Sequence, residues 1–594
     1  MSGLAAVIST SRDHPVTQDE IDGLAAAYAG LRGAGQRYDE QADGRVRLVK
    51  IDTRHPHRPG IESRDGSWVA TTGAALGPTS LVGVDVARLD GQFSLFAYDA
   101  EGERIEFAVD HFGFDALYVA ERPHRVFVSN CALALAKHLG ASPDPFGVAS
   151  FVTSGYHFGK LTNWLGIERM DPAERWIIAD HRVQKTRYWR PEVDESVRSL
   201  SFDKTVDHCI DSVTATLRRL LTDTPAAWSD LTGGYDSRLM NLLLQRAGVR
   251  FGTTTRDTPT VEDIEIARRL AELQGWEWRH TKLPTDWHER VGDEIPTALA
   301  WADANLEVLQ LSRVLWPHSL LAESRPILFS AGGGEHFQYA AWKSEFLRAG
   351  RSNRVHFDNF IDMRMLKPVN RAMFAKDWAP EIKEDFRRRL AQHVAPYSDA
   401  PNTVQLDLIY AYKSMGHFGA YAASDSAYLV AQVPFYYKDV FSTAFSTNFR
   451  YRNNHRLVRH MMQRLDPRLA SQATSRGGPA EPWRPSNVHR FLPYYAQIGR
   501  KAVNKISHKV TGRTFLAAPP PTWLWEDKAN NAVLDRLGRE EPLEHATMRS
   551  AALFDPGVLD DFLAAARSSG FTQTPMLGRI LTIELALRAT DSAL

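Results

Sequence analysis

Short apolar runs alternate with turn residues through the first third of the chain. Residues 80–130, SLVGVDVARLDGQFSLFAYDAEGERIEFAVDHFGFDALYVAERPHRVFVSN, place β-branched and aromatic runs between Gly, Asp and Asn. This alternation is typical of strands joined by turns. Residues 173–189, AERWIIADHRVQKTRYW, continue it as a hairpin-like pair. We therefore predict a strand-rich domain over about the first 190 residues.

A helical period replaces this pattern from about residue 202. Phe202, Val206, Ile210, Val213 and Leu217 recur at spacings of three and four, which places them on one helix face. A strand (226–231), a glycine turn, a helix, a strand (250–255) and a helix (261–275) follow. Alternating strands and helices favour a parallel sheet covered by helices. We predict an α/β protein with domains at 1–195 and 196–594, divided within the polar stretch WRPEVDESVRSLS (189–201).

Beyond residue 340 the pattern is mainly helical. A Gly/Pro-rich loop (475–487) and a stiff connector, LAAPPPTW (516–523), interrupt it. The basic run GRKAVNKISHKVTGR (499–513) is either a nucleic-acid or membrane contact or a solvated helix face. The second reading is favoured, because Lys+Arg and Asp+Glu both total 71 and the net charge is zero.

The amino-acid composition indicates an ordinary globular protein. A hydrophobic content of 43% and a charged content of 24% are ordinary for a globular protein. The two cysteines, Cys131 and Cys209, suggest a reducing compartment, and we expect both to pack in the core. No apolar run reaches the roughly 18 residues of a membrane span. We expect a cytoplasmic protein with no nucleic-acid or membrane partner.

The turn LTGGYDSR (231–238) is the clearest candidate for chemistry. A strand that ends in two glycines and leads into a helix leaves backbone N–H groups at the carboxyl edge of a parallel sheet, where anions bind. The turn has neither the spacing and lysine of the mononucleotide P-loop nor the G-x-G-x-x-G dinucleotide pattern. The acidic Asp236 suits a cation that bridges it to phosphates.

LTGGYDSR resembles the S-G-G-x-D-S pyrophosphate loop of the N-type ATP pyrophosphatases. The chain as a whole resembles the asparagine synthetase family, over nearly its full length and in the same order of motifs. The matching segments are MSGLAAV (1–7), LDGQFSLFAYD (89–99), VDHFGFDALYVA (109–120), GIERMDPAERWIIADHRVQKTRYW (166–189), SAGGGEHF (330–337), VAQVPFYYKDV (430–440) and LGRILTIELALR (577–588).

The resemblance implies an N-terminal glutaminase-like αββα domain of the Ntn-hydrolase type and a C-terminal synthetase domain that uses ATP and Mg²⁺. It implies a reaction in which a carboxylate attacks the α-phosphate, pyrophosphate leaves and an amine attacks the acyl-adenylate. It implies magnesium ligands at Asp236 and Glu335. The residues implied at the nucleotide are Leu231, Thr232, Gly233, Gly234, Asp236, Ser237, Thr254, Ser330 and Ala331.

The N-terminal domain departs from the family at its nucleophile. Ser2 stands where the family has cysteine. Removal of Met1 would expose Ser2, and an amine-activated serine can act as a nucleophile. The family's N-G-E-x-Y-N, R-G-P-D and R-L-x-I-x-D segments are absent, however. We favour a degenerate domain kept as a scaffold over an active serine enzyme, so that the amine comes from the substrate.

The synthetase domain departs from the family pattern at three further positions. Glu335 replaces the usual Asp, which still allows magnesium binding. Gly332 stands where relatives have a Glu or Tyr that helps to deprotonate the amine, which leaves His336 and His417 as candidate bases. The late lysine that neutralises pyrophosphate is replaced, in our interpretation, by Arg476, with Lys438 as the second choice.

These departures indicate a glutamine-independent amide ligase. Family members that have lost the nucleophile include β-lactam synthetases and lasso-peptide macrolactam cyclases. The resemblance therefore suggests specialised metabolism, with a small-molecule or peptide substrate bearing carboxylate and amine and with possible peptide-processing partners. The aromatic segments 416–430 and 433–449 either line an acceptor pocket or form core helices. The alternatives are an asparagine synthetase that uses ammonia or Ser2, and a non-catalytic pseudoenzyme.

Overall fold

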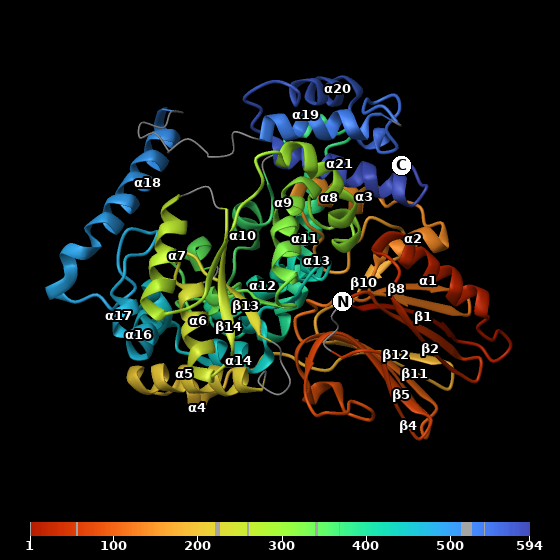
Figure 1. The fold of residues 1–594 in the computed structure, drawn as a ribbon, viewed down its shortest axis with the longest axis horizontal. Helices are drawn as coiled ribbons and strands as arrows, with labels where there is room; N and C mark the ends of the chain where they lie inside the picture. The colour runs from red at the N-terminus through yellow and green to blue at the C-terminus, as the bar shows by residue number, and fades with distance from the viewer. Residues whose placement is uncertain are drawn as a thin grey trace.

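The computed structural model describes residues 2–594 except 55–57, 220–225, 258–260, 339–341, 368, 512–525 and 540. The predicted connector at 516–523 lies outside the described residues. Two antiparallel sheets form the N-terminal part, drawn in red and orange in Figure 1, and a parallel sheet surrounded by helices forms the rest. The predicted α/β class, with antiparallel strands first and a parallel sheet second, is confirmed.

Each N-terminal sheet has six strands, and neighbouring strands within it are antiparallel. The first runs β10 (Glu168–Arg169), β8 (Tyr118–Arg122), β9 (Arg125–Ser129), β1 (Ser2–Ser9), β3 (Val46–Asp52) and β2 (Gln36–Ala42). The second runs β12 (Arg182–Arg187), β11 (Glu174–Ala179), β7 (Arg104–Val109), β6 (Asp90–Asp99), β5 (Ser67–Leu76) and β4 (Ile61–Arg64).

The period of two in β1 explains how the two sheets pack. Leu4, Ala6 and Ile8 point into the core between the sheets. Ala5 and Val7 point the other way, toward α1 (Gln18–Arg32) and α2 (Ala132–Leu139). Successive side chains of a strand alternate between faces, so one strand contributes to two layers.

The outer face of the second sheet has a different cover. Its apolar side chains, such as Phe93 and Leu95, pack against residues 81–89, which contain the single turn η1 (Val86–Arg88). Among the described residues, this loop takes the place that a second helix pair has in the expected αββα arrangement.

The parallel sheet holds five short strands. Its order is β15 (Trp278–Thr281), β14 (Phe251–Arg256), β13 (Ala227–Asp230), β16 (Ile327–Phe329) and β17 (Val430–Gln432). Both faces are covered, as parallel sheets require. One face packs on α5 (Phe202–Arg218), α6 (Asp236–Ala247), α7 (Val261–Gln274) and α16 (Arg456–Leu465). On the other, Trp228 and Leu328 meet Leu321 of α9 (Val308–Ala322).

Further helices complete the C-terminal part. α18 projects from the body of the molecule, while α19, α20 and α21 gather at one end beside α3 (Figure 1). Their bounds are α3 (Pro145–Ser154), α8 (Trp287–Trp301), α10 (Phe357–Arg364), α11 (Ala379–Val394), α12 (Asn402–Ser414), α13 (Ala420–Asp425), α14 (Lys438–Ser446), α18 (Leu492–Thr511), α19 (Glu526–Leu537), α20 (Pro556–Ala565) and α21 (Thr574–Ala589). No helix in the described part is long and apolar enough to cross a membrane.

Buried polar contacts join the N-terminal sheets to the helical part. Arg32 at the end of α1 donates to the carbonyl of Ala300 at 2.9 Å and forms an ion pair with Asp303 at 2.8 Å. Both side chains of this pair are buried, so removing either partner would leave an uncompensated charge. Cys131 and Cys209 are free and buried, as expected.

Candidate active site

The glycine turn lies where the parallel strands end. It joins β13 to α6, and the amide of Leu231 donates to the carbonyl of Thr254 at 2.8 Å. Ser330 follows β16, the neighbour of β13 on its other side. Because the carboxyl ends of adjacent parallel strands share one edge of the sheet, the three segments that the sequence indicated come together.

Nine of the residues predicted at the nucleotide and the metal line a single cleft of about 450 Å³. They are Leu231, Thr232, Gly234, Asp236, Ser237, Thr254, Ser330, Ala331 and Glu335. Phe418, from the aromatic segment 416–430 that was one candidate for an acceptor pocket, also lines the cleft. Sequence reasoning missed other lining residues, which include Asp230, Arg256, Asp257, Gln310 and Arg313. These lie on three separate segments with no shared motif, so only the folded chain reveals them.

Internal hydrogen bonds fix the shape of the turn. The amide of Thr232 donates to Ser237 Oγ at 3.0 Å, and the amide of Gly233 donates to Asp263 Oδ1 at 3.0 Å. A Cβ on Gly233 would lie 2.4 Å from that carboxylate oxygen and 2.9 Å from the Cβ of Ser475. Glycine is therefore required at 233 by the close approach of α7 and the loop after α16.

Arg238 holds this turn to a distant segment. Its guanidinium is fully buried and donates to the carbonyls of Gly233 at 3.2 Å and Gln472 at 3.1 Å, and also to that of Ala473. The amide of Ser475 adds a bond to the Gly233 carbonyl at 3.0 Å. The glycine turn is thus tied to residues 472–475 behind the cleft.

Asp236 and Glu335 form an acidic pair inside the cleft. Burial and the charge of Glu335 raise the pKa of Asp236, against the lowering effects of Arg476 and of the hydrogen bond from Gln338. A divalent cation would remove this repulsion, and carboxylate oxygens are the ligands that Mg²⁺ prefers. No group of three or more acidic, His or Cys side chains in the described residues could hold a metal alone. The pair therefore fits a metal that takes its remaining ligands from phosphates and water.

Arg476 lies beside this pair. Its guanidinium carbon is 5.7 Å from the centre of the Tyr235 ring, and its Nη1 is 3.2 Å from His455 Nε2. It also interacts electrostatically with Asp236. The structure thus brings Arg476 to the acidic end of the cleft. The amine of Lys438, by contrast, donates to the carbonyls of Ala87 and Leu89 at 3.1 Å, in the contact with the N-terminal sheets.

Neither candidate histidine is placed as a base. His336 is buried among Tyr410, Tyr436 and Phe441, and neither ring nitrogen has a hydrogen-bond partner among the described residues. Burial and the charge of Arg452 lower its pKa to about 3. His417 packs on Tyr156, Phe418 and Tyr421, and burial lowers its pKa to about 3. The turn η2 (Gly334–Phe337) directs His336 into the core, so His336 belongs to the predicted motif but does not line the cleft.

Two residues of α12 approach Glu335 instead. Burial, together with the charges of Lys367 and Arg364, lowers the pKa of Lys413 to about 8, while Glu335 acts in the opposite direction. Burial and the charge of Glu335 raise the pKa of Tyr410, one turn earlier. The sequence carries no motif for this pair, because its partner lies more than 70 positions away in the chain.

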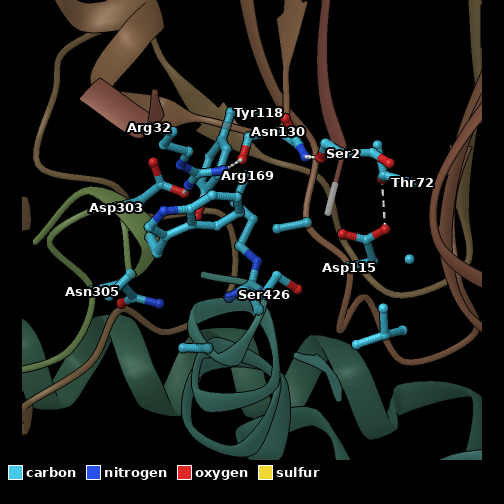
Figure 2. Close-up of a pocket in the computed structure, with 17 residues that line it drawn as sticks. Ser2, Arg32, Thr72, Asp115, Tyr118, Asn130, Arg169, Asp303, Asn305 and Ser426 are labelled. Carbon is cyan, nitrogen blue, oxygen red and sulfur yellow. Dashed lines mark hydrogen bonds and ion pairs between the residues drawn. The ribbon is translucent and has the colours of Figure 1, made fainter. Parts of the chain in front are cut away.

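Ser2 lies in a second, separate cavity of about 40 Å³ between the sheets and the helical part (Figure 2). Asn130 fixes the start of β1, because its amide group donates to the carbonyl of Ser2 at 3.0 Å and accepts from the amide of Leu4 at 2.9 Å. Figure 2 shows Ser2 between Asn130 and Thr72. Met1 lies outside the described residues.

Several of the remaining polar groups of this cavity are hydrogen-bonded. Thr72 donates to Asp115 at 2.6 Å, and burial raises the pKa of Asp115 to about 6. Arg169 is 2% exposed and donates through Nη2 to the carbonyl of Gly113 at 2.7 Å, while its Nε and Nη1 have no hydrogen-bond partner among the described residues. The cavity resembles a polar interior more than a substrate entrance.

One comparison with known proteins concerns this N-terminal part. Residues 78–189 match the family model described as a glutamine amidotransferase domain. That segment is therefore similar to an amidotransferase domain, and it contains Asp115 of the Ser2 cavity. No curated protein matches the chain.

Two solved structures are similar at a low level. One is glutamine phosphoribosylpyrophosphate amidotransferase from B. subtilis with ADP and GMP, at 11% identity, over 47% of this chain and 65% of that one, with a TM-score of 0.22. The other is described as the allosteric regulatory enzyme of purine biosynthesis, at 11% identity, over 42% of this chain and 64% of that one, with a TM-score of 0.20. The chain thus spans slightly less than two thirds of each. Likenesses this distant establish no shared reaction.

Proposed function

We propose that this protein is an ATP-dependent amide ligase that adenylates a substrate carboxylate and then joins it to an amine without using glutamine. The observation that carries the proposal is the meeting of the glycine turn, Asp236 and Glu335 in one cleft at the carboxyl edge of the parallel sheet. A fixed anion cradle next to an acidic pair suits a nucleotide bound with a divalent cation.

Each part of the cleft has a role in this proposal. The turn 231–237 and the start of α6 would hold the ATP phosphates, and Thr254, Ser330 and Ala331 would flank the nucleotide. Asp236 and Glu335 would hold Mg²⁺, which when bound would offset the negative charge of the pyrophosphate. Arg476 would add a permanent positive charge, since a guanidinium matches phosphate oxygens well.

The reaction balances in two steps. A carboxylate oxygen of the substrate bonds to the α-phosphorus, and the bond from that phosphorus to the pyrophosphate oxygen breaks. The amine nitrogen then bonds to the acyl carbon, the bond from that carbon to AMP breaks, and the amine loses a proton. We propose Lys413 as the acceptor of that proton: it does not line the cleft itself, but it interacts electrostatically with Glu335, which does, and its lowered pKa leaves part of it neutral near pH 8.

The residue at position 2 supports a substrate-borne amine. Ser2 replaces the family's cysteine, and a serine hydroxyl is a weaker nucleophile than a thiolate. The resemblance to β-lactam synthetases and lasso-peptide cyclases then favours ring closure or condensation with a bulky amine, on a small molecule or a peptide. Asparagine formation from ammonia is the nearest alternative.

Substrate-dependent ATP–pyrophosphate exchange with Mg²⁺ tests the proposal, across amino acids, small diacids and leader-free peptides. We expect exchange with one class of carboxylate, loss of at least 100-fold in Asp236→Asn, and no change in the control Asp561→Asn, an exposed site on α20. Exchange with aspartate followed by asparagine formation from ammonia would replace the proposal with its alternative. Failure of the wild type to bind Mg-ATP would favour a non-catalytic role.

A further inference from the structure

A second hollow lies where the chain leaves the N-terminal sheets. Residues 187–191, from the end of β12 onward, pass over α11 and α12 beside a narrow pocket of about 30 Å³, which adjoins a groove of about 430 Å³. We name it the aromatic pocket. Its lining includes His111, Phe112, Trp189, His393, Tyr397 and Tyr412. No residue that lines it also lines the nucleotide cleft or the Ser2 cavity.

Flat rings make up most of its walls. His393 stacks on Tyr412, with ring centres 4.1 Å apart and planes 4° from parallel. Trp189 meets His111 edge-on, with ring centres 5.0 Å apart. Leu408 and Ala411 of α12 supply apolar surface. Walls of this kind favour a ligand with an aromatic or similarly flat apolar body.

Positive charge gathers at the mouth of the pocket. Arg187 and Arg190 line both the pocket and an adjoining open groove, and within the described part of the chain their guanidinium groups have no hydrogen bond or ion pair. Arg389, also at the groove, is already paired with Asp385 at 2.7 Å. Two unpaired guanidiniums beside an apolar hollow suit an anion, because each fork matches a carboxylate or phosphate.

The acidic groups of the groove do not neutralise these arginines. Asp171 accepts a hydrogen bond from Tyr412 at 3.0 Å, and Glu174 is paired with Lys160 at 2.9 Å. Burial, together with the charges of Arg187 and Arg190, lowers the pKa of His393 to about 3, so that ring is neutral. The groove is lined by five cationic side chains (Lys160, Lys185, Arg187, Arg190 and Arg389) and two acidic ones (Asp171 and Glu174), so the net charge around the mouth is positive.

A buried polar group inside the pocket is also without a partner. His111 lines the pocket and is 2% exposed, and neither of its ring nitrogens has a hydrogen-bond partner among the described residues. Burial and the charge of Lys438 keep its pKa well below the ordinary value. A neutral imidazole can donate one hydrogen bond and accept another, so His111 can meet a polar atom of a ligand.

We infer that the aromatic pocket and the groove at its mouth together bind a small organic anion, with a flat apolar ring against Trp189, His393 and Tyr412 and a carboxylate or phosphate held by Arg187 and Arg190. The site is separate from the nucleotide cleft and takes a different class of ligand. Its walls come from both parts of the chain, the segment after β12 on one side and α11 with α12 on the other.

Calorimetric titration of the full chain with phenyl phosphate, phenylacetate and benzyl alcohol tests the inference. We expect at least one of the two anions to bind, and the neutral alcohol to bind at least tenfold more weakly. The anion that binds more tightly shows whether the site prefers a phosphate or a carboxylate. Saturating Mg-ATP should leave this binding unchanged, because the nucleotide cleft is elsewhere.

Variants locate the site. Arg187→Gln and Arg190→Gln should each weaken the bound anion at least tenfold, while Arg182→Gln, an exposed position on the same strand β12, should leave binding unchanged. All three side chains are at least partly exposed, and melting temperatures within about 2 °C of wild type would show that the fold is kept. Absence of binding by both anions, equal binding of benzyl alcohol, displacement by Mg-ATP, or indifference to Arg187 and Arg190 would each overturn the inference.

Discussion

Asp236, the first residue of α6, and Glu335, in the turn after β16, repel each other inside the cleft. Burial raises the pKa of Asp236, and the neighbouring carboxylate raises it further. The protein keeps two acidic groups close together at a place where doing so destabilises the folded state. Strain of this kind is expected where a site is shaped for a ligand that is positively charged.

Replacing the first of these carboxylates should stabilise the protein without ligands. An acid whose pKa is raised by folding contributes most below its ordinary pKa, and that contribution is lost as the pH rises through the raised value. Asp236→Asn should therefore match wild type near pH 4 and exceed its free energy of unfolding by on the order of 1 kcal/mol at pH 8. Urea unfolding between pH 4 and pH 8 measures this difference in the free energy of unfolding. Mg-ATP should raise the melting temperature of wild type only, and a variant less stable than wild type at pH 8 would contradict the interpretation.

The close approach at Gly233 gives a second prediction. A methyl group there would collide with Asp263 and Ser475, so Gly233→Ala should displace the turn and weaken ATP binding at least tenfold, about 1.4 kcal/mol. Gly30→Ala is the matched control, because Gly30 lies in α1 with no atom within 4 Å of the added carbon. It should leave ATP binding unchanged and stabilise the helix by about 0.5–1 kcal/mol. Equal ATP affinity in Gly233→Ala and wild type would show that the turn does not hold the phosphates.

Lys413 should set the pH dependence of amide formation. Its lowered pKa, about 8, means that the neutral amine increases as the pH rises through that value. The rate of amide formation should rise between pH 7 and 9 with a midpoint near 8. Lys413→Arg should abolish this rise and lower the rate about 10²-fold or more, because a guanidinium stays protonated, while ATP–pyrophosphate exchange persists. A rise that survives in Lys413→Arg would assign the base elsewhere.

Ser2 should be dispensable. Ser2→Ala should leave amine-dependent ligation within about twofold of wild type, and glutamine should not replace the amine in either protein. Asn130→Ala serves as a structural comparison, because it removes both hydrogen bonds that fix the start of β1 and should reduce stability by about 1–2 kcal/mol. Glutamine-dependent product formation that disappears in Ser2→Ala would show an active serine glutaminase.

Local patterns predicted the elements that surround the cleft. The strand at 226–231 is β13 (Ala227–Asp230), and the helix at 261–275 is α7 (Val261–Gln274). The phosphate turn and the segment at 330–335 could be paired because each directly follows a strand, and parallel strands bring such segments to one edge.

The parts that escaped prediction depend on contacts distant in sequence. Burial and the charges of Lys367 and Arg364 lower the pKa of Lys413, while Glu335 acts in the opposite direction. None of these three residues is near Lys413 in the chain. His336 stands next to a predicted metal ligand, yet a single turn rotates it into the aromatic core. The loop cover on the outer face of the second sheet likewise follows from packing of residues 81–89, for which a helix period gives no signal.

Arg238 has a bearing on how far the protein can be shortened. Its guanidinium donates to the carbonyl of Gly233 and to those of Gln472 and Ala473, which lie more than 230 positions further along the chain. A truncated chain that ended before residue 472 would keep every strand of the parallel sheet and the whole phosphate turn, yet it would leave a buried permanent cation without two of its three carbonyl acceptors. An autonomous fragment that keeps the proposed nucleotide site must therefore extend at least through Ala473, and the strand, turn and helix cannot be transplanted without that segment.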